Sequence, residues 1–310
     1  MAVITAKMVA DLRAQTGCGM MDCKKALVEA DGDFQAAIKV LREKGLAKAD
    51  SKQSRIAAEG IVDIMLTDDK NTAVMIEVNT ETDFVAKNEK FKEFVKGLLR
   101  TILANKPADV EALNACAFDG TEDSVEVVLK EQIFKIGEKI SIRRFVIVEG
   151  VLATYIHGNG AQGVIVKFES DVADKDGFAE YANNVALQAA AFPCEYVDRT
   201  EVPKEVIDRE LEIVMGQIKN DPKNANKPDQ IIEKMAQGKL GKYFEDHCLV
   251  DQEYFKADEK MSVAKYTEKT AKELGGSIAI KSFVIYTKGE GIEKREDNFA
   301  EEIANMVKGN

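Results

Sequence analysis

The sequence of 310 residues contains no tryptophan, only two histidines and five cysteines. Without tryptophan, a nucleic-acid surface built on aromatic stacking is disfavoured. His157 and His247 are the only imidazoles, so a hydrolase or metalloenzyme that depends on histidine is poorly supported. The cysteines are odd in number and scattered, so the sequence predicts neither a disulfide framework nor a zinc site. We therefore expect no metal and no cofactor.

Long apolar runs are also missing, since no stretch approaches the roughly 20 residues that a membrane-spanning helix needs. Residues 1–7 lack a basic flank followed by an apolar core, so no signal peptide is predicted. The net charge of −11, from 43 basic and 54 acidic residues, argues against overall electrostatic binding of nucleic acid. These features favour a cytoplasmic protein without a membrane partner, long enough for about two domains.

Residues 1–55 are expected to form a small helical module followed by a linker. Thr5 is a suitable N-cap for the first of three short helices, in which apolar residues recur at helical spacing. Asp31-Gly32-Asp33 separates the second helix from the third, which is expected to end at Gly45. The polar and basic stretch 48–55 is predicted to be the linker.

A pattern of strand, hairpin, strand, helix and strand occurs twice, first in residues 56–148 and again in residues 149–202 with 247–290. The strands are indicated by short runs rich in Ile and Val between turn residues. We therefore predict an α+β fold with two related subdomains, each an antiparallel sheet backed by helices. The expected strands are 60–66, 73–79, 140–148, a run beginning at 149–152, 163–168 and 278–286, and the expected helices are 89–103 and 178–191.

Residues 203–246 interrupt the second subdomain with two apolar stripes at helical spacing, separated by a polar tip at 220–228. They predict an antiparallel helical hairpin, of the coiled-coil type, that projects from the domain. Because such a hairpin buries little core by itself, its exposed apolar rows favour a protein partner or a self-interface. The tail, 291–310, has apolar residues on one face and is expected to form a C-terminal helix.

The segment between strand and helix in the first subdomain is the most informative one. The chain from Val78 to Phe91 is longer than the equivalent chain from Phe168 to Phe178, and the extra residues include Asp83 and Phe84. A turn added to one copy of a shared scaffold indicates a functional role. From the residues alone, Asp83 fits a helix N-cap. For Phe84 two alternatives stay open: it packs in the core, or it points outward as a wedge for a partner.

Other candidates have weaker signals. Two adjacent residues of a helix cannot both face the core, so at least one of Met20 and Met21 is expected to be exposed, where methionine makes adaptable contacts. Arg13 fits a solvated helix position, and His157 fits a surface turn. The basic residues in 130–144 fit a solvated edge better than a contact with an acidic partner or RNA.

Two further kinds of site are rejected. Gly158-Asn159-Gly160 lacks a third glycine and a following helix, so no direct nucleotide binding is predicted. The paired acids Asp68-Asp69 and Glu81/Asp83 lack the spacing of metal ligands. No nucleophile–base set is present either, so an enzyme is not expected.

Five segments of the chain form a set that occurs in the same order in one known family: 16–27 (TGCGMMDCKKAL), 82–87 (TDFVAK), 135–140 (KIGEKI), 155–158 (YIHG) and 289–294 (GEGIEK). On these segments the sequence resembles the bacterial translation elongation factor Ts family along the whole chain. Several long motifs in the right order make a chance similarity improbable.

The resemblance implies a guanine-nucleotide exchange factor for the GTPase elongation factor Tu, without bond-making chemistry. It implies that the N-terminal module is similar to a ubiquitin-associated domain and docks on the GTPase domain. It also implies that the terminal helix docks on elongation factor Tu and that the hairpin at 203–246 supports a homodimer in some members. The competing hypothesis is a scaffold or chaperone that binds proteins through the N-terminal module, and a fully buried Phe84 would favour it.

The resemblance also assigns residues. Those implied to displace Mg²⁺ from elongation factor Tu are Thr82, Asp83, Phe84 and Val85. Those implied to contact elongation factor Tu elsewhere are Arg13, Met20, Met21, Ile136 and His157.

Overall fold

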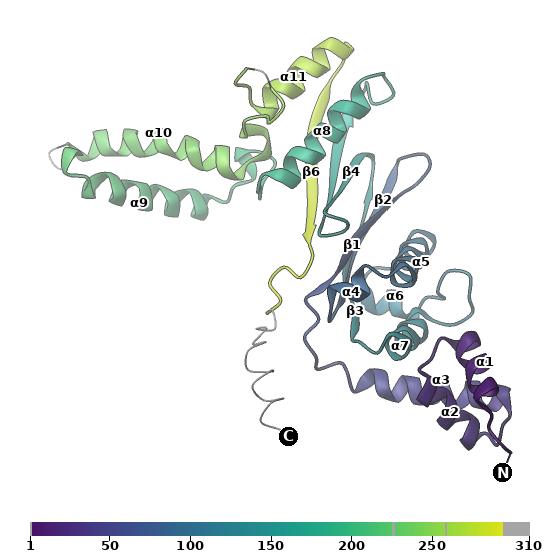
Figure 1. The fold of residues 1–310 in the computed structure, drawn as a ribbon. Coiled ribbons are helices and arrows are strands. Elements are labelled where there is room, and N and C mark those ends of the chain that lie inside the picture. Colours follow the sequence, from purple (N-terminus) through teal and green to yellow (C-terminus); the bar gives the residue numbers. More distant parts are fainter. Residues whose placement is uncertain (1, 225–226, 258, 294–310) are drawn as a thin grey trace.

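The computed structural model describes residues 2–224, 227–257 and 259–293. The predicted α+β fold is confirmed, with two three-stranded antiparallel sheets in the orders β1-β2-β3 and β4-β5-β6 (Figure 1). Among the described residues, no helix combines the length and apolarity needed to cross a membrane. The strands are β1 (Glu59–Leu66), β2 (Thr72–Thr80), β3 (Ile140–Glu149), β4 (Val151–His157), β5 (Gln162–Ser170) and β6 (Ile278–Thr287).

Helices cover the outer face of each sheet, and the inner faces of the two sheets pack on one another. The first sheet is covered by α5 and α7, the second by α8 and α11 (Figure 1). The sequence did not predict α6, α7 or α11. The body helices are α4 (Asp83–Ala86), α5 (Glu89–Asn105), α6 (Val110–Ala115), α7 (Val125–Ile136), α8 (Phe178–Ala191) and α11 (Val263–Leu274), with 3₁₀ turns at η1 (Arg199–Glu201) and η3 (Leu249–Asp251).

The contact between the sheets depends on a glycine. Strand β2 is apolar on both faces because Val74 packs toward the helices while Met75 packs toward the other sheet. A Cβ on Gly163 of β5 would lie 2.7 Å from a methyl of Val62 and 2.8 Å from the sulfur of Met75. The sheets therefore approach so closely that any side chain at this position would force its neighbours to shift.

Three short helices form the N-terminal module, with a small core of its own. Thr5 caps α1 (Ala6–Thr16) as predicted, and α2 (Met20–Glu29) follows. The prediction that Gly45 ends the third helix is wrong, because α3 (Phe34–Asp50) continues beyond it and takes in the start of the predicted linker. Gly45 faces the ring of Phe134 on α7, and a Cβ there would lie 3.2 Å from that ring. Packing thus explains the glycine, which does not act as a stop signal.

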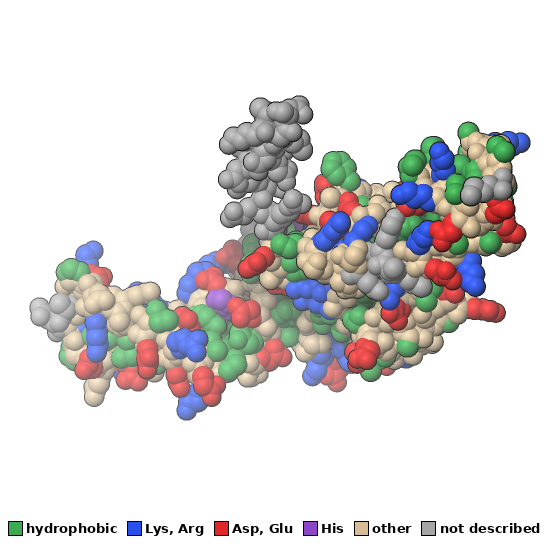
Figure 2. All heavy atoms as spheres, turned by 90° about the horizontal axis from the view of Figure 1, so that it is seen from below, with side chains coloured by type: hydrophobic (Ala, Val, Ile, Leu, Met, Phe, Trp, Pro, Cys, Tyr) green, Lys and Arg blue, Asp and Glu red, His purple; other side chains and the backbone are tan. Residues whose placement is uncertain are grey.

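A helical hairpin of α9 (Lys204–Asn220) and α10 (Asp229–His247), with the 3₁₀ turn η2 (Pro222–Asn224) near its tip, projects from the body. It lies at the opposite end of the molecule from the N-terminal module (Figure 1). Figure 2 shows acidic and basic side chains interspersed along the hairpin and body on this face, so the net negative charge forms no single patch there. Apart from its first three residues, the predicted C-terminal helix, 291–310, lies outside the described residues.

Both sheets contain a β-bulge at the same place, which supports the internal repeat. The register of β2 with β3 shifts between Glu77 and Val78, and that of β5 with β6 shifts between Lys167 and Phe168. In the first sheet the extra residue is Arg143, because Glu77 pairs with Arg144 and Val78 pairs with Ile142. Neighbouring residues of a regular strand point to opposite faces, but the bulge brings both arginines to Glu77.

Glu77 is a fully buried carboxylate that joins the two sheets. It accepts hydrogen bonds from Arg143 Nη1 at 2.9 Å, from Arg144 Nε at 2.7 Å and from the backbone N–H of Gly289, just after β6, at 2.8 Å. The Arg144 guanidinium also stacks 4.1 Å above the ring of Tyr286 on β6. The predicted solvated basic edge is therefore wrong for these two arginines, which neutralise a buried acid.

Burial alone would raise the pKa of Glu77. The hydrogen bonds from the Gly289 N–H, Arg143, Asn79 and Arg144 outweigh burial, so the pKa of Glu77 is lowered in the folded protein. A lowered folded pKa means that the contribution to stability is complete above the ordinary glutamate pKa. That contribution is lost as the pH falls through the lowered value.

Glu77→Gln should reduce the free energy of unfolding by about 3 kcal/mol at pH 7, because two half-buried arginines lose their carboxylate. The difference between the two proteins should shrink as the pH is lowered below about 4.5. Urea unfolding at pH 7 and at pH 4 measures both effects. The control is Glu89→Gln, an exposed carboxylate on α5, which should leave stability nearly unchanged. A difference that is constant across this pH range would contradict the assignment.

Gly163→Ala should reduce the free energy of unfolding by about 1–3 kcal/mol, because the added methyl overpacks the contact between the sheets. Gly216→Ala in α9 is the matched control, since nothing lies within 4 Å of its Cβ position. That variant should gain up to about 1 kcal/mol from helix propensity. Thermal and urea unfolding compare the two, and equal effects would mean that the sheets tolerate a side chain between them.

Candidate functional site

The chain leaves the first sheet at Thr80 and enters the four-residue helix α4. Ala86 packs in the core and Val85 packs partly against it, so the residue before them faces outward. Phe84 is 81% exposed, the second most exposed of the large hydrophobic side chains in the described chain. The core alternative for Phe84 is therefore wrong, and the outward orientation that the wedge hypothesis requires is present.

The alternative in which Asp83 caps the helix is also wrong. Thr82 occupies the N-cap position in an extended conformation, and its side chain caps no helical N–H. Asp83 is the first residue of α4, and its carboxylate accepts a hydrogen bond from Lys87 Nζ at 2.6 Å. That contact lowers the pKa of Asp83, so the residue next to Phe84 is a stable surface anion.

A hollow of about 390 Å³ lies beside Phe84 and is formed by three segments that are distant in the sequence. Gly17 comes from the turn between α1 and α2, Phe84 and Val85 from the α4 turn, and Ile136 from the end of α7. The structure thus brings three of the candidate residues into one surface with the N-terminal module. Asn88, Lys90, Gln132 and Lys135 complete the lining.

The candidate residues of the N-terminal module lie near Gly17, which lines the hollow, along the sequence. Met20 and Met21 begin α2, three and four residues after Gly17, and are 53% and 62% exposed. The prediction that at least one is exposed is confirmed, and both are. Arg13 is exposed on α1. Exposed methionines next to a turn offer an adaptable apolar contact.

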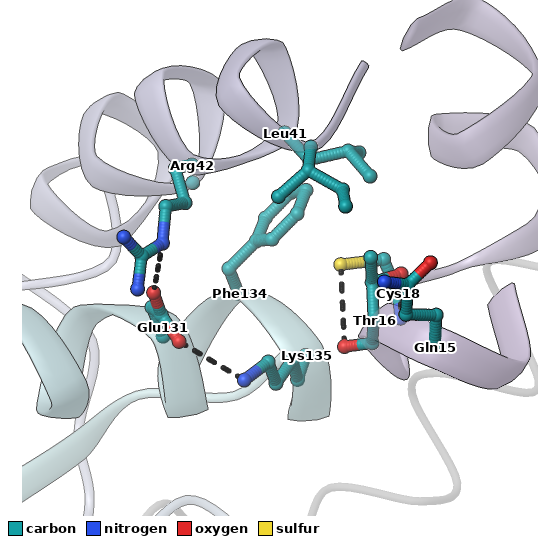
Figure 3. A pocket seen from close by; sticks show the side chains of 10 residues that line it. Gln15, Thr16, Cys18, Leu41, Arg42, Glu131, Phe134 and Lys135 are labelled. Carbon is teal, nitrogen blue, oxygen red and sulfur yellow. Dashed lines mark hydrogen bonds and ion pairs between the residues drawn. The ribbon is translucent and has the colours of Figure 1, made fainter. Parts of the chain in front are cut away.

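The seat of the module on α7 is shown in Figure 3. Phe134 of α7 points toward Leu41 and the helix α3, and the residues around it line an open pocket of about 230 Å³. Arg42 forms ion pairs with Glu131 at 2.8 Å and with Asp123 at 2.7 Å. These contacts hold the N-terminal module against α7, and the last turn of α7 lines the hollow.

His157 belongs to a different surface. It is exposed at the end of β4, in the second sheet, and does not line the hollow. Its Nδ1 lies 3.2 Å from the hydroxyl of Tyr155. The next turn residues are held by the first sheet, since Gly160 accepts a hydrogen bond from the Val62 N–H at 2.8 Å.

Two features of the site were not predicted from the sequence: helix α7, whose last turn lines the hollow, and the Glu138 carboxylate, which binds the α4 turn. Helix α7 has a signal that could have revealed it: Ser124 caps it and Gly137 ends it in a left-handed conformation. The carboxylate of Glu138 accepts hydrogen bonds from both the N–H and the hydroxyl of Thr82, at 3.0 and 2.7 Å. No local pattern in the sequence indicates the contact between Glu138 and Thr82.

The described residues contain no cluster of three or more side chains able to hold a metal ion. Burial raises the pKa of Cys194 to about 12 and that of Cys248 to about 11, so both are neutral thiols at pH 7.

Comparison with known proteins identifies one family. The sequence profile of the family described as Elongation factor TS matches residues 81–290. Elongation factor Ts of Syntrophotalea carbinolica is 44% identical over 308 residues, which cover 98% of this chain and 99% of that protein. Elongation factor Ts of Clostridioides difficile is 45% identical over 311 residues, which cover 99% and 100% respectively. That of Clostridium novyi is 43% identical over 309 residues.

Phe84→Ala should leave the free energy of unfolding within about 0.5 kcal/mol of the parent value, because the ring makes little contact with its own fold. Phe91→Ala is the matched control: seven residues later in the chain, that ring is fully buried, and its loss should reduce the free energy of unfolding by about 3–5 kcal/mol. Urea unfolding of both variants tests the contrast. A loss above about 1 kcal/mol for Phe84→Ala would show that the ring stabilises the fold.

Proposed function

Because the chain belongs to the elongation factor Ts family and is therefore a translation elongation factor, we propose that it binds elongation factor Tu and accelerates GDP release. The observation that carries this proposal is the exposed Phe84 beside the anion Asp83, at the edge of a hollow. Leaving a phenylalanine in water forgoes about 2–3 kcal/mol of burial free energy, which a protein partner can recover. The same exposure disfavours the scaffold or chaperone alternative, in which Phe84 is core.

The proposed action is displacement of the metal that helps the GTPase hold its nucleotide. A GTPase binds GDP through a cradle of backbone N–H groups together with Mg²⁺. Thr82, Asp83, Phe84 and Val85 would enter beside that ion and displace it. Without the metal, the charge on the diphosphate is less well balanced, and GDP leaves faster.

Thermodynamic reciprocity then returns the factor to its free state. If the factor weakens GDP binding by a given ratio, GDP weakens binding of the factor by the same ratio. Incoming GTP therefore releases the factor from elongation factor Tu. The factor itself needs no bond-making chemistry and no cofactor for this cycle.

We propose that the other candidates hold elongation factor Tu at separate points. Arg13, Met20 and Met21 would bind the GTPase domain, Ile136 would extend that interface, and His157 would contact another domain. The contacts between the N-terminal module and α7 fix the positions of Met20 and Met21 relative to Ile136. The hairpin at 203–246 is proposed as a site of self-association, and the segment 291–310 as a further contact with elongation factor Tu.

The double variant Asp83→Ala/Phe84→Ala should lose most of the acceleration of GDP release, because it removes both the wedge and its anion. The loss of an interface hot spot worth about 2 kcal/mol corresponds to a roughly 30-fold slower GDP release when the concentration of the factor limits the rate. Stopped-flow release of a fluorescent GDP analogue from the cognate elongation factor Tu measures it.

Phe192→Ala, which truncates an exposed ring at the end of α8 and outside every proposed contact, is the control and should exchange like the parent. If the parent protein leaves GDP release at its spontaneous rate, the exchange function is wrong. If the parent accelerates release and the double variant does so equally, the wedge is wrong.

A further inference from the structure

We propose that Glu138 is a positioning residue, whose carboxylate holds Thr82 so that the chain turns outward and presents Phe84. The inference rests on the proposed exchange function for its consequence, although its structural part can be tested without elongation factor Tu. Two observations support it: the hydrogen bonds where β2 and β3 separate, and the different contacts at the equivalent place in the second sheet.

Two carboxylates bridge the chain where the backbone ladder of the first sheet stops. The last pair of that ladder is Thr80 with Ile140. Continuing the same register would place Glu81 opposite Lys139 and Thr82 opposite Glu138. At both positions a side chain replaces the backbone acceptor: Glu81 accepts from the Lys139 N–H at 2.5 Å, and Glu138 accepts from the Thr82 N–H at 3.0 Å.

A carboxylate reaches further than a backbone carbonyl, so these bonds allow the two chains to move apart without leaving their N–H groups unpaired. Glu138 also accepts from the hydroxyl of Thr82 at 2.7 Å, and so it grips both the backbone and the side chain of that residue. Thr82 is thereby fixed as the extended N-cap of α4, and Phe84 stands two residues further on.

The second sheet provides an internal comparison. Its ladder ends with Ser170 opposite Ile278, and the next residue, Asp171, accepts from the Ser277 N–H at 2.6 Å, as Glu81 does in the first sheet. The position that corresponds to Glu138 is Gly276, which has no side chain. Val172, opposite this glycine, packs in the core.

The two copies of the scaffold thus share the first carboxylate and differ in the second. Where the second carboxylate is missing, Val172 is buried in the core. Where Glu138 is present, the residue in the place of Val172 is Thr82, which is only partly buried and is bound by that carboxylate. A helix of four residues is too short to be stable by itself, so the bound Thr82 at its start and the packed Val85 and Ala86 at its end together set the direction in which it projects.

The anchor also reaches the linker from the N-terminal module. Glu81 receives Arg55 Nη1 at 3.2 Å, and Lys139 Nζ donates to the carbonyl oxygens of Gln53 and Arg55 at 2.6 and 2.8 Å. The α4 turn, the start of β3 and the linker therefore form one connected unit. Glu138 is the member of this unit that binds the turn itself.

The test uses the absence of tryptophan in this chain, since Phe84→Trp supplies a single fluorescent reporter on the turn. In that background we compare Glu138→Gln, Thr82→Val and their combination with the parent, and use urea unfolding to verify that each is folded. An amide in place of the carboxylate offers an NH₂ to one of the two Thr82 donors, so that bond is lost.

Each single variant should lower the fluorescence anisotropy of the introduced tryptophan in the free protein. The combination should lower it no further, because both substitutions disrupt the same contact between Glu138 and Thr82. Thr82→Ser keeps both donors and should retain the parent anisotropy. Glu126→Gln, which removes a carboxylate of α7 that pairs with Lys130 instead, is the matched control and should change nothing. Unchanged anisotropy in Glu138→Gln would overturn the inference.

GDP release from elongation factor Tu is then measured with Phe84 in place. Glu138→Gln and Thr82→Val should each slow the accelerated release about tenfold, and the combination about equally. Additive losses would overturn the inference and make Glu138 a direct contact. If the unchanged protein does not accelerate release, the exchange function fails, while the anisotropy still decides whether Glu138 holds the turn.

Discussion

The carboxylate of Glu77 lies between the two sheets, out of contact with water, and receives donors from both of them. Such a charge is stable in the interior only when its partners are in place. The partners come from β3, through a bulge that brings two neighbouring arginines to one acid, and from the backbone just after β6. This requirement, together with the close contact at Gly163, sets the relative position of the sheets. The surface around Phe84 lies on one sheet and His157 on the other, so their separation follows from it as well.

Much of the fold could be predicted from the chain because the strands are dense runs of Ile and Val between turn residues. Helix α8 was predicted with the bounds that the structure shows. Helix α7 was missed because its first residues, Val125-Glu126-Val127-Val128, fit a strand as well as a helix at that length. Gly45 misled in the opposite way: the local signal indicated a helix end, but a close contact with Phe134 accounts for the glycine.

The candidate site was partly predictable for a similar reason. The extra length of chain between β2 and α5, compared with its counterpart in the second sheet, indicated an added turn, and that turn carries the exposed Phe84. The partners of Glu77 and Glu138 could not be predicted, because they lie more than 50 residues away along the chain. Their meeting depends on a bulge and on the splaying of two strands, and neither leaves a pattern in the sequence.

The exposure of Phe84 means that two kinds of selection act on different residues of one short turn. Val85 and Ala86 pack into the core, so a library of variants sorted only for cellular abundance would retain apolar residues there. The same library would leave codon 84 free to drift, since the fold derives almost nothing from the ring. Only growth that depends on the partner would hold that codon in place. A lineage that no longer needed the interaction would lose this side chain early, while the scaffold around it persisted.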